Sequence, residues 1–275
     1  MTASSRQVED PRPRTAAMNR GFDVLELVVD SGQVRLAEVA KALGISRATA
    51  FRALSALRRR GYIEHVPSEQ IYRLGTGFIT LAARSAASSI VRVASSVMAD
   101  LRNETLETVN LALMRGGRLI YVSVFDGPQA LRITPKVGAE AALHATALGK
   151  AVLMMMPVDD QDRLLGGEPY PAFTESTIVS RKGLDQELAT SLARGYSVDR
   201  EEEELGGMCL AAPIVDERGY PFGGLSVAGP VTRMRRLGER QLGRRVRESA
   251  VEIGTKLHAG REKPAKEARA AHHRE

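Results

Sequence analysis

Few side chains in this 275-residue chain could do covalent chemistry. The single cysteine, Cys209, could act as a nucleophile with His144 as its base, because an imidazole can deprotonate a neighbouring thiol. No third residue at a recognisable spacing orients this pair, so a small-molecule hydrolase or transferase is only an alternative. The five histidines have no cysteine or histidine partner at zinc-ligand spacing, and we expect neither a metal nor a cofactor.

Other polar residues favour binding over catalysis. Lys150 follows a glycine as in a phosphate-binding loop, but His144 stands where the first glycine of that motif belongs. Asp199 and residues 201–204 could supply acid and base carboxylates, although a run of acids is more often a solvated face. Residues 144–150 run from a loop into a helix start, where free backbone N–H groups favour an anion such as a carboxylate. We therefore predict that the protein is not an enzyme.

Residues 36–74 predict a winged helix-turn-helix. Leu36, Val39 and Leu43 recur at helical spacing, and Gly44 supplies the permissive backbone that ends the first helix. The apolar face of the second helix consists of Ala50, Leu54 and Leu57. Two alternating segments, 62–66 and 71–74, flank a polar turn and predict the two-stranded wing. The helices alone would also fit an ordinary hairpin with a solvated charged face, and the wing is what favours a DNA-binding domain.

The polar face of the second helix carries the residues expected to contact DNA. Ser46 is a favourable N-cap. Arg47, Thr49 and Arg52 project away from the apolar stripe, where arginine can read guanine bidentately and threonine can touch a thymine methyl group. The predicted DNA-binding residues are Ser46, Arg47, Thr49, Arg52, Arg58, Arg59 and, on the wing, Arg73.

The charges are unevenly distributed along the chain. The total is 39 Lys and Arg against 33 Asp and Glu, a net charge of +6. Residues 1–75 hold 12 basic and 8 acidic side chains, residues 76–230 hold 14 and 19, and residues 231–275 hold 13 and 6. An acidic centre is unfavourable on phosphates, so DNA contact should be confined to the N-terminal part, with the basic C-terminal tail as a possible helper.

Length and composition predict two domains. A chain with 43% hydrophobic residues can bury two modest cores, and no apolar run is long enough to span a bilayer. The first residues lack the apolar core of a signal peptide, so we expect a cytoplasmic protein. The predicted organisation is a flexible lead (1–17), a winged helix-turn-helix (18–75), a linker helix (76–89), an effector-binding domain (90–258) and a disordered basic tail (259–275).

The predicted second domain is an α+β module around one mainly antiparallel sheet. The expected strands are residues 108–113, 119–124, 130–134, 208–215 and 221–227. The expected helices are residues 90–105, 147–156, 159–165, 184–194 and 233–257.

Five blocks in this region carry a family resemblance. They are residues 103–112, 143–151 (LHATALGKA), 195–202 (GYSVDREE), 209–219 (CLAAPIVDERG) and 225–230 (LSVAGP). Their order and separations resemble the isocitrate lyase regulator (IclR) family of bacterial transcription factors, over about residues 18–258. The resemblance implies a GAF-like α/β effector-binding domain, a homodimer or dimer of dimers, and control by a small molecule that is often an organic acid.

The resemblance also implies a set of effector contacts. They are Ala147 and Leu148 as backbone donors, Asp199 and Ser226 as polar side chains, Cys209 as a wall, and Ile133 and Ala141 as apolar lining. Ala142 replaces a usual proline, and Ala228 stands where one type of pocket has a second serine. The missing hydroxyl predicts an effector larger or more apolar than glyoxylate or pyruvate. The alternative is that these blocks are core packing, and Cys209 is equally consistent with a small buried hydrophobe.

Together these features predict a homo-oligomeric regulator that binds double-stranded DNA at an inverted-repeat operator and responds to a small organic acid. A sequence-tolerant architectural DNA-binding protein is the alternative. That class needs no sensor domain, whereas about two thirds of this chain is predicted to be one.

Overall fold

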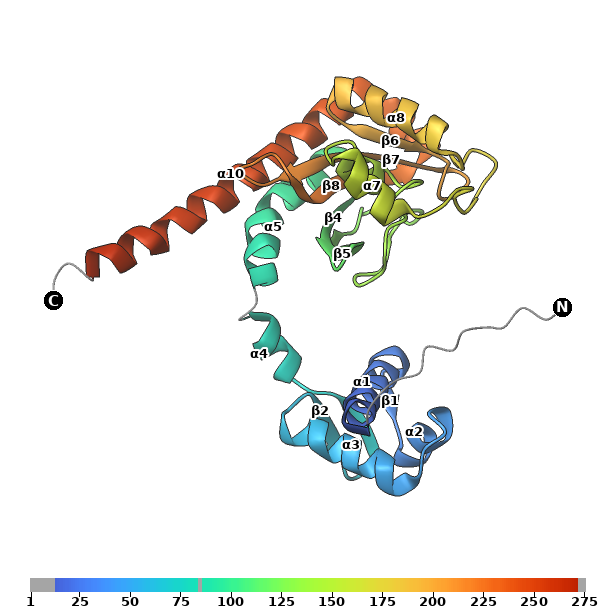
Figure 1. Ribbon diagram of the computed structural model, residues 1–275, viewed down its shortest axis with the longest axis vertical. Coiled ribbons are helices and arrows are strands. Elements are labelled where there is room, and N and C mark those ends of the chain that lie inside the picture. Colours follow the sequence, from blue (N-terminus) through green and yellow to red (C-terminus); the bar gives the residue numbers. More distant parts are fainter. Residues whose placement is uncertain (1–12, 84–85, 272–275) are drawn as a thin grey trace. The chain divides into compact units, whose positions relative to one another are not determined.

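The structure is a computed structural model that describes residues 13–83 and 86–271. The chain divides into two compact units, Met1–Ser88 and Ser89–Glu275. Each unit has a hydrophobic core of its own. The two are described in turn (Figure 1).

The first unit is a winged helix-turn-helix. Its elements are α1 (Pro13–Ser31), β1 (Gln33–Val34), α2 (Leu36–Ala42), α3 (Arg47–Arg59), β2 (Ile63–Val66), β3 (Ile71–Leu74) and α4 (Gly77–Ala83). The three strands form one antiparallel sheet in the order β1-β3-β2. The helices α2 and α3 and the wing strands were predicted, and β1 was not. Helix α1 begins at Pro13, inside the predicted flexible lead, and proline is favourable at a first helical position.

The core of this unit explains why the two predicted helices need α1. Val24 and Val28 on α1 are fully buried against Val39 of α2 and Leu54 of α3. The apolar faces of α2 and α3 therefore close onto a third helix as well as onto each other. The outward face of α3 remains in solvent.

The second unit is a five-stranded antiparallel sheet with helices on both faces. Its elements are α5 (Ala86–Thr105), β4 (Thr108–Arg115), β5 (Arg118–Phe125), α6 (Ala147–Leu153), α7 (Val158–Leu165), α8 (Arg181–Arg194), β6 (Ser197–Arg200), β7 (Gly207–Val215), β8 (Pro221–Pro230), α9 (Val231–Leu237) and α10 (Glu239–Ala271). The strand order is β5-β4-β8-β7-β6. The predicted α+β fold is confirmed.

The side chains of each strand alternate between the two faces of the sheet, and each face carries its own hydrophobic cluster. Leu111 and Leu210 belong to the cluster that includes residues of α5 and α10, whereas Ala112 and Ala211 belong to the cluster that includes residues of α6 and α8. Successive side chains of a strand point to opposite faces, so one sheet can carry both clusters. The face covered by α6 is the one that bears the cavity described below.

Three expectations about this unit need correction, and one strand was missed. The strand predicted at 130–134 is a loop, because it has no neighbour in the sheet, and β6 was not predicted. The helix predicted at 233–257 is broken at Gly238, whose φ of +78° lies in the left-handed region that glycine tolerates. Helix α10 continues to Ala271, through most of the segment predicted to be a disordered tail. That segment is rich in Ala, Lys and Glu, which are strong helix formers.

Within the described ranges 13–83 and 86–271, no helix is both long enough and apolar enough to cross a bilayer. The same residues contain no cluster of three potential metal-binding side chains.

Candidate functional site

The N-terminal turn of α3 is organised by Ser46. Its Oγ accepts the Thr49 backbone N–H at 3.2 Å, as predicted for an N-cap. The two hydroxyls lie 2.9 Å apart, and Arg52 Nη2 donates to Thr49 Oγ1 at 3.3 Å. Thr49 is half-buried, whereas Arg47 and Arg52 are exposed. The helix therefore presents two exposed guanidinium groups, one of them hydrogen-bonded to Thr49.

Three further arginines were predicted to contact DNA. Arg58 and Arg59 are exposed in the last turn of α3. Arg73 on β3 lies opposite Glu64 on β2 and forms an ion pair with it. Both partners are about half exposed, so the pair contributes little stability and Arg73 could exchange it for a phosphate.

Sequence reasoning missed Phe51 on the same helix. Its side chain is 52% exposed, although phenylalanine is usually buried. An apolar side chain on this face can contact a thymine methyl group. The sequence did contain a signal, because Phe51 lies outside the apolar stripe formed by Ala50, Leu54 and Leu57.

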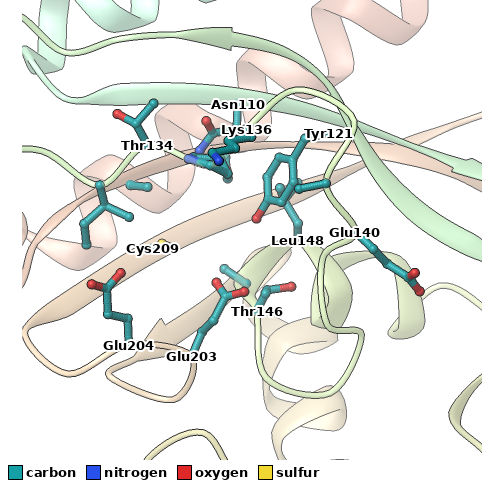
Figure 2. A pocket seen from close by; sticks show the side chains of 16 residues that line it. Asn110, Tyr121, Thr134, Lys136, Glu140, Thr146, Leu148, Glu203, Glu204 and Cys209 are labelled. Carbon is teal, nitrogen blue, oxygen red and sulfur yellow. The ribbon is translucent and has the colours of Figure 1, made fainter. Parts of the chain in front are cut away.

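The second unit contains a cavity of about 400 Å³ between the loop after β5 and the start of α6. Figure 2 shows the side chains that line it. Five of the seven predicted effector residues are among them, namely Ile133, Ala147, Leu148, Cys209 and Ser226. The structure thus brings together residues far apart in the sequence.

Ala141 and Asp199 do not line the cavity. Ala141 is buried in the hydrophobic cluster under α6, and its N–H donates to the Leu119 carbonyl at 2.8 Å. Asp199 is also buried, and its Oδ1 accepts the Glu202 N–H at 2.7 Å. Burial raises the pKa of the Asp199 carboxyl to about 6, although that hydrogen bond and Lys150 oppose the rise. Asp199 therefore shapes the turn after β6, a placement that its motif does not reveal.

Several lining residues were missed by the sequence analysis. They are Asn110, Tyr121, Thr134, Pro135, Lys136, Ala139, Glu140, Thr146, Glu203 and Glu204, in addition to Ala228, which was named as a departure. Asn110 on β4 lies opposite Ser226 on β8, and its Nδ2 donates to Ser226 Oγ at 3.3 Å. Tyr121 on β5 is buried, and burial raises the pKa of its phenol. A polar Asn110 within an otherwise apolar strand was the signal available for the first of these.

Helix α6 begins at the wall of the cavity. The Thr146 Oγ1 accepts the Gly149 N–H at 2.9 Å and donates to the Ala142 carbonyl at 2.8 Å. The first two helical N–H groups, those of Ala147 and Leu148, have no partner within a helix. Gly149 is required here, because a Cβ would lie 2.3 Å from the Leu143 carbonyl oxygen.

A buried ion pair joins α6 to the turn after β6. Lys150 is fully buried and pairs through Nζ with Glu202 Oε1. The Glu202 carbonyl accepts the Thr177 hydroxyl at 2.6 Å, which ties a third segment to the same turn. Burial raises the pKa of the Glu202 carboxyl, with Lys150 acting in the opposite sense. Lys150 is therefore committed to Glu202 and does not act as a phosphate-loop lysine.

The hypothetical Cys209–His144 pair is not assembled. His144 Nε2 lies 2.8 Å from the Pro171 carbonyl, and its ring stacks on Phe173 with centroids 5.7 Å apart. Cys209 lines the cavity, which His144 does not. Burial, followed by the charge of Asp199, raises the pKa of the Cys209 thiol, which keeps it protonated.

Comparison with known proteins matches each of the two units to a domain of one protein family. Residues 17–67 match the IclR helix-turn-helix domain, and residues 83–255 match the family described as bacterial transcriptional regulator IclR C-terminal. The HTH-type transcriptional regulator BhcR of Paracoccus denitrificans (strain Pd 1222) is 33% identical over 79% of this chain and 78% of its own length.

Two solved structures share the fold. The Thermotoga maritima IclR has a TM-score of 0.75 at 28% identity, covering 88% of this chain and 99% of that one. An IclR homolog from Microbacterium hydrocarbonoxydans, complexed with 4-hydroxybenzoate, has a TM-score of 0.78 at 23% identity, with the same coverage of 88% and 99%. The resemblance of the sequence blocks is confirmed, and the chain belongs to the IclR family of bacterial transcriptional regulators.

Proposed function

We propose that this regulator binds an inverted-repeat operator through α3 and that a small molecule in the cavity of the second unit controls operator affinity. The cavity carries the effector part of the proposal, because it brings together five residues that the family resemblance names as effector contacts. Its volume of about 400 Å³ lies within the range of small-molecule sites. The exposed arginines of α3 support the operator part.

Base reading is tested by Arg47→Ala and Arg52→Ala. Each is expected to lose about 1–3 kcal/mol of specific binding if a bidentate base contact is removed. Non-specific binding should fall less. The measurement is a gel-shift titration at fixed salt with a site selected from a random DNA library. Lys182→Ala on α8 removes an exposed charge from the other unit and serves as the control. Wild-type affinity in both arginine variants would contradict the assignment of α3 to the major groove.

Assembly is tested separately. One winged domain contacts a single half-site, and two domains related by a dyad read an inverted repeat with half-sites about one helical turn apart. We expect at least a dimer in sedimentation equilibrium, protecting both half-sites from nuclease. A stable monomer that protects a full operator would be incompatible with this proposal.

We further propose that the effector is a small organic acid. At the cavity wall, a carboxylate can be received by the Lys136 ammonium or by the N–H groups of Ala147 and Leu148 at the start of α6. The bound 4-hydroxybenzoate of the Microbacterium relative is one such acid. A thermal-shift screen of carboxylic acids against the full chain tests this class.

Ser226→Leu tests the place of binding. The larger side chain occupies part of the cavity and removes a hydroxyl, so affinity for an effector found in the screen should weaken by about 1 kcal/mol or more. Calorimetry measures the affinity, and circular dichroism checks the fold. Ser176→Leu on an exposed loop outside the cavity is the matched control. Unchanged affinity in a folded Ser226→Leu variant would place the ligand elsewhere.

A further inference from the structure

Carboxylates outnumber cations around the cavity. Its ionisable lining includes Glu140, Glu203 and Glu204 against Lys136 alone. Glu140 has a cation of its own, because Arg118 Nε lies 3.6 Å from its Oε2. Among the residues whose side chains the structure describes, none forms a salt bridge with Glu203 or Glu204.

The turn after β6 aims these two side chains at the cavity. Glu202 is held away from it by Lys150, and the next two residues line it (Figure 2). Glu203 and Glu204 keep an exposed surface at the cavity. Partial desolvation and the nearby charges of Asp199 and Glu204 raise the pKa of Glu203 to about 7. An uncompensated negative potential of this kind repels a carboxylate and attracts a cation or a hydrogen-bond donor.

Asn110 provides an independent observation. The residue lines the cavity and is only 2% exposed. Its Nδ2 donates to Ser226, whereas its buried Oδ1 has no hydrogen-bond partner among the residues that the structure describes. Buried amide oxygens are nearly always paired, so an unpaired one on a residue that lines a cavity points to a hydrogen-bond donor on the ligand. The Asn110 amide oxygen and the two carboxylates are all hydrogen-bond acceptors, so each favours a ligand that carries hydrogen-bond donors.

We propose that the effector carries hydrogen-bond donors, most effectively an ammonium group, at the end that faces Glu203 and Glu204, and that a second donor reaches Asn110 Oδ1. The ligand class is then an amino- or hydroxy-substituted acid, with its carboxylate on the side of Lys136. Simple dicarboxylates are disfavoured. This inference rests on the proposed effector function of the same cavity, and it goes beyond the organic-acid class by assigning the chemistry of the other end.

Matched ligands test the inference with the full chain. The aromatic series is 4-(aminomethyl)benzoate, 4-hydroxybenzoate, 4-methylbenzoate and terephthalate, and the aliphatic series is 4-aminobutanoate, 4-hydroxybutanoate, pentanoate and glutarate. Within a series the carboxylate stays constant and only the far end changes. We expect calorimetry to rank the affinities as ammonium, hydroxyl, methyl and carboxylate, with about tenfold or more between the first and third.

Variants assign the preference to the named side chains. Glu203→Gln should reduce the advantage of the ammonium member about tenfold, and Glu203→Lys should make the dicarboxylate the tightest ligand. Glu175→Gln removes an exposed carboxylate outside the cavity and should change nothing. Circular dichroism confirms that each variant is folded. An ammonium preference that survives Glu203→Gln and the Glu203→Gln/Glu204→Gln double variant would overturn the inference.

The outcomes separate this inference from the proposed function. If all four members of a series bind equally, or if the dicarboxylate binds tightest, the organic-acid effector stands and the donor requirement is overturned. Benzylamine and 4-aminobutanol complete the set, because they keep the amine and lack the carboxylate. If only these two bind, the donor requirement stands and the organic acid is wrong. If no probe binds, both are overturned.

Discussion

Lys150→Met is expected to lower the free energy of unfolding of the second unit by about 3–5 kcal/mol. The substitution leaves the Glu202 carboxylate buried without its cation, and removing one partner of a buried pair costs far more than the pair contributes. Urea denaturation followed by circular dichroism measures the change. Lys182→Met, an exposed position on α8, should stay within about 0.5 kcal/mol.

A second substitution identifies the cause of the loss. Lys150→Met combined with Glu202→Met removes both charges, and the double variant should recover most of the stability. Effector affinity is not expected to recover with it, because the turn loses the pair that holds it against α6. A double variant no more stable than Lys150→Met would show that lost packing, not the unpaired charge, is responsible.

Leu54→Ala is expected to destabilise the first unit by about 2–5 kcal/mol and thereby abolish operator binding at physiological temperature. Leu54 is fully buried in a core that α1, α2 and α3 share, and a small domain has little stability to lose. Differential scanning calorimetry should show an early transition for this unit, with the transition of the second unit unchanged. Leu74→Ala makes the same truncation at an exposed position and should cost less than about 1 kcal/mol. A single common transition in Leu54→Ala would show that the two units do not unfold independently.

The sequence was most informative where the backbone conformation depends on the residue type at one or two neighbouring positions. Gly44 and Ser46 mark the turn and the cap between α2 and α3, and both signals depend on residues within a few positions. The hairpin between β4 and β5 was equally readable from Gly116 and Gly117, which both have positive φ. Short strands were not predicted, because they depend on pairing with residues far away in the sequence. Strand β1 has two residues, and only its pairing with β3 makes it a strand.

The cavity was predictable only in part. The family blocks named Ser226 and Cys209, which both line the cavity. Spacing along a strand, however, cannot show whether Asp199 faces a cavity or caps the following turn. The acids at 201–204 looked like a solvated face because charge runs usually are. Their separate roles follow from the turn after β6, which rotates consecutive side chains toward different neighbours.

In the turn after β6, the four consecutive glutamates at 201–204 make different contacts. Glu201 accepts the Gly206 N–H at 2.9 Å, Glu202 is bound to Lys150, and Glu203 and Glu204 face the cavity. Mutations at the last two positions can alter what the cavity attracts without disturbing the frame, whereas Glu202 must change together with Lys150. If the cavity holds the proposed effector, ligand choice can evolve by exchanges at two adjacent codons. Two duplicated genes would then respond to metabolites of opposite charge while keeping the same fold.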